Sequence, residues 1–178
     1  MEKFCYDNVE SNCFDYGGLY EWDELMNYTT SSNANPSGRQ GICPYGWHVP
    51  SDAEWCEMET YLDPDVSCSG SGGVLSAIAG GKLKEIGLNH WTTPNTEATN
   101  SSGFTARPGG FTHDDMGGSI TGNWPFWDLG LYARFYTSTE SSDSALDAWL
   151  RTVSYDSSQE WRNTDKKDYA CSVRCVKN

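Results

Sequence analysis

Among the residues that can do chemistry, the seven cysteines are the most informative in number and spacing. Seven in 178 residues is many for a protein of the reducing cytosol, so the count favours an oxidising compartment. Spacing alone leaves about 105 ways to form three disulfides with one cysteine free. The spacing argues against a disulfide between Cys171 and Cys175. They lie four residues apart on one expected strand, about 13 Å from each other. Since no CxxC motif occurs, we expect disulfides and no cysteine-based metal site.

The histidines and carboxylates give no pattern typical of catalysis. His48, His90 and His113 are isolated, and we expect His48 to be a hydrogen-bonded structural residue. No Ser-His-Asp or Cys-His set has a recognisable context, and no glycine-rich phosphate loop follows an expected strand. We therefore expect no enzymatic activity and no cofactor.

Calcium needs separate consideration, because acidic residues gather in several expected turns. We expect these carboxylates to be solvated turn residues, and folding and binding to require no metal. The residues that a calcium ion would otherwise use are Asp63, Asp65, Asp114, Asp115 and Asp128.

The remaining chemistry is that of a binding surface in the C-terminal third. Tyr and Trp offer large contact areas at low entropic cost, while Ser and Asn offer adaptable hydrogen bonds. Side chains alternate between the two faces of a strand. In residues 148–155, Trp149, Arg151 and Val153 would share one face, and Leu150, Thr152 and Ser154 would share the other. The alternative is that these are ordinary solvent-facing residues.

These residues depend on helices and strands that the sequence also indicates. Ser51-Asp52-Ala53-Glu54 is a capping box, followed by apolar residues at helical spacing, so we predict a helix over 51–62. A second helix is predicted over 74–86, weakened by Gly80 and Gly81. Helices followed by strands indicate an α+β fold. The strands are predicted at about 104–111, 132–139, 147–155, 159–163 and 169–176.

Six motifs in order carry a family resemblance: CPYGWHVPSDAEW (43–55), GGKLKE (80–85), NSSGFTARPGGF (100–111), TSTE (137–140), AWLR (148–151) and SVRCV (172–176). The series resembles the Fibrobacter succinogenes major paralogous domain, which is found in Bacteroidetes surface proteins, and it covers nearly the whole chain. The resemblance implies a C-type-lectin-like fold, with two helices packed on a twisted antiparallel sheet. It also implies a disulfide-containing lead-in over 1–42, packed on a domain over 43–178.

The resemblance narrows the disulfide pairing. It implies Cys5–Cys13, Cys56–Cys68 and Cys43–Cys175, with Cys171 left free and buried where relatives carry an aromatic residue. A related fold uses two C-terminal cysteines to generate formylglycine, but family usage makes Cys175 structural. The tryptophans that sit in or near family motifs are assigned to the core: Trp47, Trp55, Trp91 and Trp149.

The resemblance also implies a binding site. Some relatives resemble the variable proteins of diversity-generating retroelements, and their variable positions correspond to residues of 150–165. The sugar-binding calcium signatures of many C-type lectins, Glu-Pro-Asn or Gln-Pro-Asp and Trp-Asn-Asp, are missing. Together with strand parity, this gives a predicted ligand-binding face with eight exposed residues: Leu150, Thr152, Ser154, Asp156, Trp161, Asn163, Thr164 and Asp165. Four further residues of the predicted site are expected near them: Trp127, Tyr132, Arg134 and Tyr136.

Charge and hydropathy limit the partners. The net charge of −13 argues against nucleic acid or an anionic membrane, because neutralising phosphates requires Lys and Arg. No apolar run approaches about 18 residues, so we expect no membrane insertion. Since Met1-Glu2-Lys3-Phe4 does not resemble a leader, we expect that a secretion leader has been removed.

We therefore expect a secreted or surface-anchored bacterial module that binds a protein or glycan ligand on another cell or host surface. A phage receptor-binding protein is an alternative origin. The alternative functions are a carbohydrate-binding module, with Trp124, Trp127 and Trp161 as stacking platforms, and a domain that only displays other parts.

Overall fold

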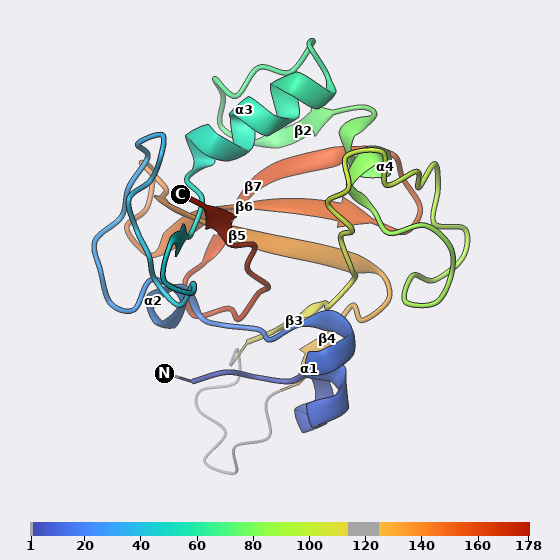
Figure 1. Cartoon of the computed structure of the whole chain (residues 1–178), viewed down its shortest axis with the longest axis horizontal. Helices are drawn as coiled ribbons and strands as arrows, with labels where there is room; N and C mark the ends of the chain where they lie inside the picture. Colours follow the sequence, from blue (N-terminus) through green and yellow to red (C-terminus); the bar gives the residue numbers. More distant parts are fainter. Residues whose placement is uncertain (1, 114–124) are drawn as a thin grey trace.

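The computed structural model describes residues 2–113 and 125–178, which form an α+β fold (Figure 1). Its main sheet is antiparallel with strand order β2-β7-β6-β5. The strands are β2 (Gly73–Ser76), β5 (Tyr132–Glu140), β6 (Asp147–Ser154) and β7 (Glu160–Lys166). Two short antiparallel pairs join β1 (Trp47–His48) to β8 (Val176–Lys177) and β3 (Phe111–Thr112) to β4 (Phe126–Trp127). The helices are η1 (Tyr6–Asn8), α1 (Glu10–Tyr16), α2 (Trp22–Leu25), α3 (Asp52–Leu62) and α4 (Ala79–Leu83).

Helix α3 forms where the capping box predicts it. The Ser51 hydroxyl accepts a hydrogen bond from the Glu54 N–H, and the Glu54 side chain accepts one from the Ser51 N–H. Glu54 also contacts His48, whose other ring nitrogen lies 2.6 Å from Asn178 Oδ1. The prediction of a hydrogen-bonded His48 is confirmed. The start of α3 is thereby tied to the end of the chain.

The predicted helix over 74–86 is wrong. The segment forms strand β2 and then the single turn of α4. Both glycines of α4 face close backbone neighbours: a Cβ on Gly80 would lie 2.0 Å from the Gln159 carbonyl oxygen, and one on Gly81 would lie 2.4 Å from that of Glu97. These glycines permit a close approach of two loops, and helix periodicity does not report that requirement.

Two of the predicted strands are also much shorter than expected. Only Phe111 of the 104–111 segment lies in a strand, and α1 was not predicted at all. In the 169–176 segment the pairing partner changes at every residue: Ala170 pairs with Thr112, Cys171 with Tyr20, and Ser172 with Phe135. Alternation in sequence predicts extended backbone, but a continuous ladder also needs one continuous partner strand.

The two faces of the main sheet are covered by different parts of the chain. On one face, α3 contributes Trp55 to a cluster with Phe135 and Val153. On the other face, the lead-in contributes Trp22 to a cluster that includes Leu150. The Trp22 indole also donates to the Thr137 carbonyl at 2.9 Å, so this residue of the lead-in contacts β5 directly.

Three of the four tryptophans assigned to the core are buried: Trp55, Trp91 and Trp149. Trp47 is a correction, because 40% of its surface is exposed. It lies in the short β1–β8 pair, opposite the exposed Lys177, away from the main sheet. Among the described residues, no helix has the length and apolar character needed to cross a membrane.

The disulfide pairs are those implied by the family resemblance. Cys5 bonds to Cys13, Cys56 to Cys68, and Cys43 to Cys175, which joins positions 132 residues apart. Cys171 is free and buried, and burial raises the pKa of its thiol to about 12. That thiol therefore stays protonated and unreactive at physiological pH.

A buried ion network joins α3 to β6 and β7. Arg151 and Arg162 both bond to Asp52, with closest distances of 2.7 Å, and Arg151 also makes two bonds to Glu59. All four side chains are at least nine-tenths buried. The Arg162 guanidinium also lies 3.4 Å from the ring centroid of Trp149. The network therefore ties the helix to the inner face of the sheet.

Glu160 completes this network as a neutral acid. It is fully buried, and neither of its carboxyl oxygens accepts a hydrogen bond within the described residues. Burial, followed by the nearby charge of Glu59, raises its pKa well above the usual range. A protonated Glu160 can donate to Glu59. Two arginines then balance two carboxylates, which avoids an unpaired buried charge.

The first prediction concerns the disulfide between the domain ends. Removing it with Cys43→Ser/Cys175→Ser should lower the free energy of unfolding by about 5 kcal/mol, because its loop is long. The matched control, Cys5→Ser/Cys13→Ser, opens a loop of 8 residues and should cost only about 2.5 kcal/mol. Equilibrium denaturation measures both, and equal losses would contradict the assignment of the main restraint to Cys43–Cys175.

The second prediction concerns the protonation of Glu160. A raised acid pKa means that the unfolded chain releases this proton at lower pH than the folded protein does, so its contribution to stability falls as pH rises above about 4.5. Glu160→Gln should remove that decline, because an amide mimics the neutral acid. Glu59→Gln should instead cost about 3–5 kcal/mol, since it breaks a buried ion pair.

Denaturant unfolding between about pH 4 and pH 8 separates the two variants. If Glu160→Gln destabilises the protein at pH 7 as much as Glu59→Gln does, Glu160 is ionised and the assignment is wrong.

Candidate functional site

Strand pairing brings the predicted binding residues into rows across the sheet. Arg134 of β5 pairs with Thr152 of β6, which pairs with Trp161 of β7. The next row along the strands runs through Leu150 and Asn163. Paired residues in antiparallel strands point to the same face. The parity argument therefore placed these side chains together on the face away from α3.

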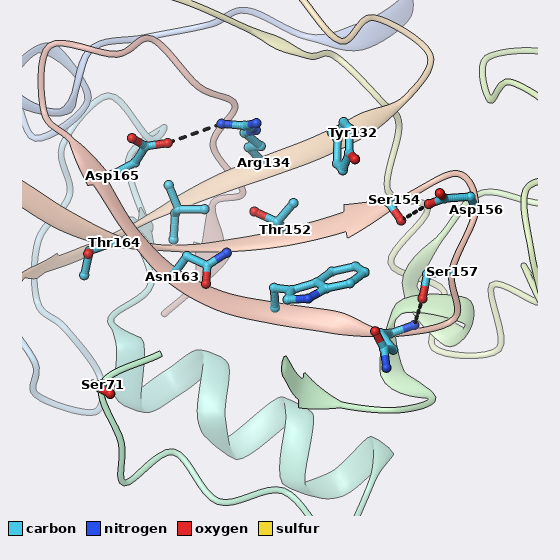
Figure 2. Close-up of a pocket in the computed structure, with 13 residues that line it drawn as sticks. Ser71, Tyr132, Arg134, Thr152, Ser154, Asp156, Ser157, Asn163, Thr164 and Asp165 are labelled. Atoms are coloured by element: carbon cyan, nitrogen blue, oxygen red, sulfur yellow. Dashed lines mark hydrogen bonds and ion pairs between the residues drawn. The ribbon is translucent and has the colours of Figure 1, made fainter. Parts of the chain in front are cut away.

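This face is hollowed into a cavity of about 700 Å³. Figure 2 shows its lining side chains, which come from β5, β6, β7 and the turn between β6 and β7. Ten of the twelve predicted ligand-binding residues line it: Tyr132, Arg134, Leu150, Thr152, Ser154, Asp156, Trp161, Asn163, Thr164 and Asp165.

The other two predicted residues lie elsewhere. Tyr136 is fully buried, and its hydroxyl donates to the Lys166 carbonyl. Trp127 stacks on the His113 ring with centroids 4.2 Å apart, and its other neighbour is Phe111. Period-2 alternation sorts side chains by face, but it does not show which part of a face another segment covers.

The expected exposure of the β6 residues is also wrong. Leu150 is 2% exposed, Thr152 8% and Ser154 1%. Trp149 is buried on the opposite face, so the predicted parity holds although the exposure does not. The reason is that the sheet has two covered faces, and Leu150 packs in the cluster formed with the lead-in. These residues form the floor of the cavity, while Asp156 and Thr164 are exposed at its margin.

Three lining residues were not predicted: Ser71, Ser157 and Gln159. Ser157 and Gln159 lie within residues 150–165, so taking that whole range and not selected positions would have included them. Ser71 approaches from the loop before β2, and the mistaken helix over 74–86 hid that approach.

Arg134 is the one cation among the described lining residues, and neighbouring groups hold it in place. Its guanidinium lies 3.2 Å from Asp165 Oδ2 and 3.3 Å from Asp128 Oδ2, and Figure 2 shows the bond to Asp165. The guanidinium carbon is 3.9 Å from the centroid of the Phe111 ring. Burial raises the pKa of Asp165, and the charge of Arg134 opposes that shift. Two carboxylates therefore hold Arg134 in place, and the lining has more acidic than basic residues because Asp156 also belongs to it.

Lys84 holds the turn between β6 and β7 from below. Its ammonium donates to the carbonyl oxygens of Thr96, Ser154 and Ser157 at 2.8–2.9 Å, and its side chain is fully buried. Burial lowers its pKa to about 8. Ser154 in turn donates to Asp156 at 2.7 Å, a bond visible in Figure 2. The conformation of this end of the cavity thus depends on a lysine in the GGKLKE motif.

Two of the candidate calcium ligands, Asp63 and Asp128, have other partners. Asp63 is buried, contrary to expectation, and accepts hydrogen bonds from Ser76 and from the Asp65 backbone. Asp128 pairs with Arg134. Asp114 and Asp115 lie outside the described residues.

Within the described residues, the His, Cys, Asp and Glu groupings compact enough for a metal ion each contain a disulfide pair. Disulfide sulfurs are not thiolate ligands, so neither grouping is suited to a metal.

The cavity is suited to binding a polar ligand. It offers two partly buried aromatic rings, Tyr132 and Trp161, beside hydroxyl, amide and carboxylate groups. The described lining residues include neither histidine nor cysteine. Aromatic rings next to directed polar groups are typical of recognition surfaces.

The comparison with known protein families agrees with the motif series. The model of the Fibrobacter succinogenes major domain matches residues 1–177. No curated protein and no solved structure gave a significant match. A match over almost the full length, together with the six ordered motifs, shows that the chain belongs to the Fibrobacter succinogenes major domain family.

Proposed function

We propose that this chain is an extracellular ligand-binding module that recognises a macromolecular ligand through the cavity on β5, β6 and β7. The observation that carries the proposal is the convergence of ten independently predicted residues on one cavity. Its volume of about 700 Å³ lies within the range of ligand pockets. Arg134 fixes the side chain of Asp165, and Lys84 fixes the main chain at Ser154 and Ser157, which lowers the entropy lost on binding.

A C-type-lectin-like fold and an adhesin or receptor role are part of this proposal. A small antiparallel sheet flanked by helices, with the two ends of the 43–178 segment joined by Cys43–Cys175, is consistent with such a fold. Three disulfides are typical of proteins outside the reducing cytosol. We infer secretion or display on a bacterial surface, with a phage receptor-binding protein as the alternative source.

Carbohydrate binding is the second candidate, and Trp161 and Tyr132 favour it. Both rings line a polar cavity beside Asp156 and Asn163, an arrangement that could stack on a sugar and bond its hydroxyl groups. Trp127 contributes less than the sequence suggested, because its ring stacks on His113. Trp124 lies outside the described residues.

The third prediction tests the cavity as the binding site. Trp161→Ala should reduce binding to a ligand found on a glycan array or in a screen of purified surface proteins by about 30-fold or more, as for a central aromatic contact. The free energy of unfolding should change by no more than about 1 kcal/mol, because Trp161 is only partly buried.

The matched control is Trp47→Ala, which removes an exposed tryptophan outside the cavity and should leave binding unchanged. Binding to glycans that depends on Trp161 favours the carbohydrate candidate. Binding to a purified surface protein that depends on Trp161 favours the first proposal. Binding that depends on Trp47 and not on Trp161 places the site elsewhere. If neither screen yields a ligand, the display-domain alternative is favoured.

The fourth prediction concerns diversification of the cavity. If the turn and strands around it are targets of a retroelement, the gene should be followed by a near-copy of its 3′ end that differs at adenines, beside a reverse-transcriptase gene. Sequencing the downstream DNA checks this. An unrelated downstream sequence would leave ligand binding intact as a proposal and remove diversification from it.

A further inference from the structure

A second cavity of about 520 Å³ lies outside the proposed ligand site. The end of α1 and its following loop, the 103–107 loop and residues 172–174 enclose it. It shares no lining residue with the first cavity. Its size is in the range of small-molecule sites.

Arg174 is the unusual residue of this second cavity. One of its nitrogens donates to the Phe104 carbonyl at 2.8 Å, and its guanidinium lies 4.2 Å from the centroid of the Phe104 ring. No carboxylate of the described residues pairs with it, although the protein carries a net charge of −13. Partial burial lowers its pKa, because the charge has lost water without gaining an anionic partner. Such a group gains most from an anion supplied by a ligand.

A second polar group in the same cavity has no partner. Ser172 is 5% exposed and lines the cavity, and its buried hydroxyl has no hydrogen-bond partner among the described atoms. A buried hydroxyl without a partner costs about 1–3 kcal/mol, which a ligand acceptor could recover. Arg107 also borders the cavity, but Glu85 already neutralises it at 3.0 Å. The exposed Asp15 is the one described carboxylate of the lining.

The cavity also has an aromatic part. Phe104 and Phe135 contact each other edge to face, with centroids 5.3 Å apart, and both line the cavity together with Tyr16 and Tyr20. The exposed surface of the whole lining is more polar than apolar, so the rings form one apolar part of a polar cavity. Those rings can contact the hydrocarbon part of a ligand, a contact that a small inorganic anion does not make.

We propose that this second cavity binds an organic carboxylate, with the carboxylate paired to Arg174 and the Ser172 hydroxyl, and with an apolar or aromatic body against Phe104 and Phe135. The planar guanidinium can bond both oxygens of a carboxylate at once. The same chemistry could come from a free aryl carboxylate or from the C-terminus of a peptide that ends in an aromatic residue. This site is separate from the proposed function and does not depend on it.

The fifth prediction tests this site with phenylacetate as the probe, followed by amide chemical shifts or calorimetry on the intact chain. Phenylacetate should bind, and its neutral isostere phenylacetamide should bind at least about tenfold more weakly, because it cannot form the ion pair. Inorganic phosphate should not compete. The peptides Gly-Gly-Phe with a free and an amidated C-terminus distinguish a peptide ligand from a small molecule, since only a peptide site prefers the free tripeptide over phenylacetate.

Variants locate the binding. Arg174→Gln should weaken phenylacetate about tenfold or more. The matched control Arg39→Gln should have no effect, because Arg39 also lacks a carboxylate partner in the described residues but bonds to Thr30 and Ser31 outside the cavity. Trp161→Ala should also leave phenylacetate binding unchanged, which separates this site from the first cavity.

Three results would overturn the proposal: no binding of either carboxylate up to about 50 mM, equal affinity for phenylacetamide, or unchanged affinity in a folded Arg174→Gln. If Arg174→Gln does not fold, Ser172→Ala replaces it. That variant should keep the fold and weaken phenylacetate about threefold or more, and unchanged affinity would then count against the site.

Discussion

The buried ion network between α3 and the sheet is the constraint on which the rest of the structure depends. Asp52 and Glu59 reach from the helix to Arg151 and Arg162, and all four charges are removed from water. Because an unpaired buried charge would be strongly destabilising, the network fixes both the rotation of α3 and the register of β6 and β7. Because side chains alternate along β6, orienting Arg151 inward also orients its neighbours outward. The floor of the ligand cavity therefore follows from the charges on the opposite face.

The cavity exists because the outward face is only partly covered. The lead-in and its Trp22 pack over one end of this face, where Leu150 joins the core. At the other end, the β6–β7 turn and Trp161 border the cavity. Cys43 and its disulfide partner Cys175 belong to the same packed cluster as Trp22 and Leu150. The floor of the cavity thus rests on residues that lie far from it in sequence.

The sequence predicts local features well, but it predicts poorly which side chains are buried by distant segments. The capping box located α3 because its signal is complete within four residues, and parity grouped Leu150 with the correct side chains. The predicted exposure of Leu150 was wrong, because the lead-in segment that covers it lies more than 100 residues away. The glycine pair at Gly80 was interpreted as helix weakness, whereas it permits contact with a distant loop. Asp52 carried no visible signal for its role, since its partners Arg151 and Arg162 come from a different part of the chain.

The manner in which Lys84 holds the β6–β7 turn has a consequence for the protein's evolution. Each acceptor of its ammonium group is a main-chain carbonyl oxygen, and Gly80 likewise packs against the main chain of this region. Every amino acid supplies that oxygen. The hydrogen bonds of Lys84 therefore depend on the path of the main chain through the turn and not on which side chains the turn carries. Mutations in the turn can therefore change the side chains that the surface presents while the main chain beneath keeps its path, so variation at the surface need not reduce stability.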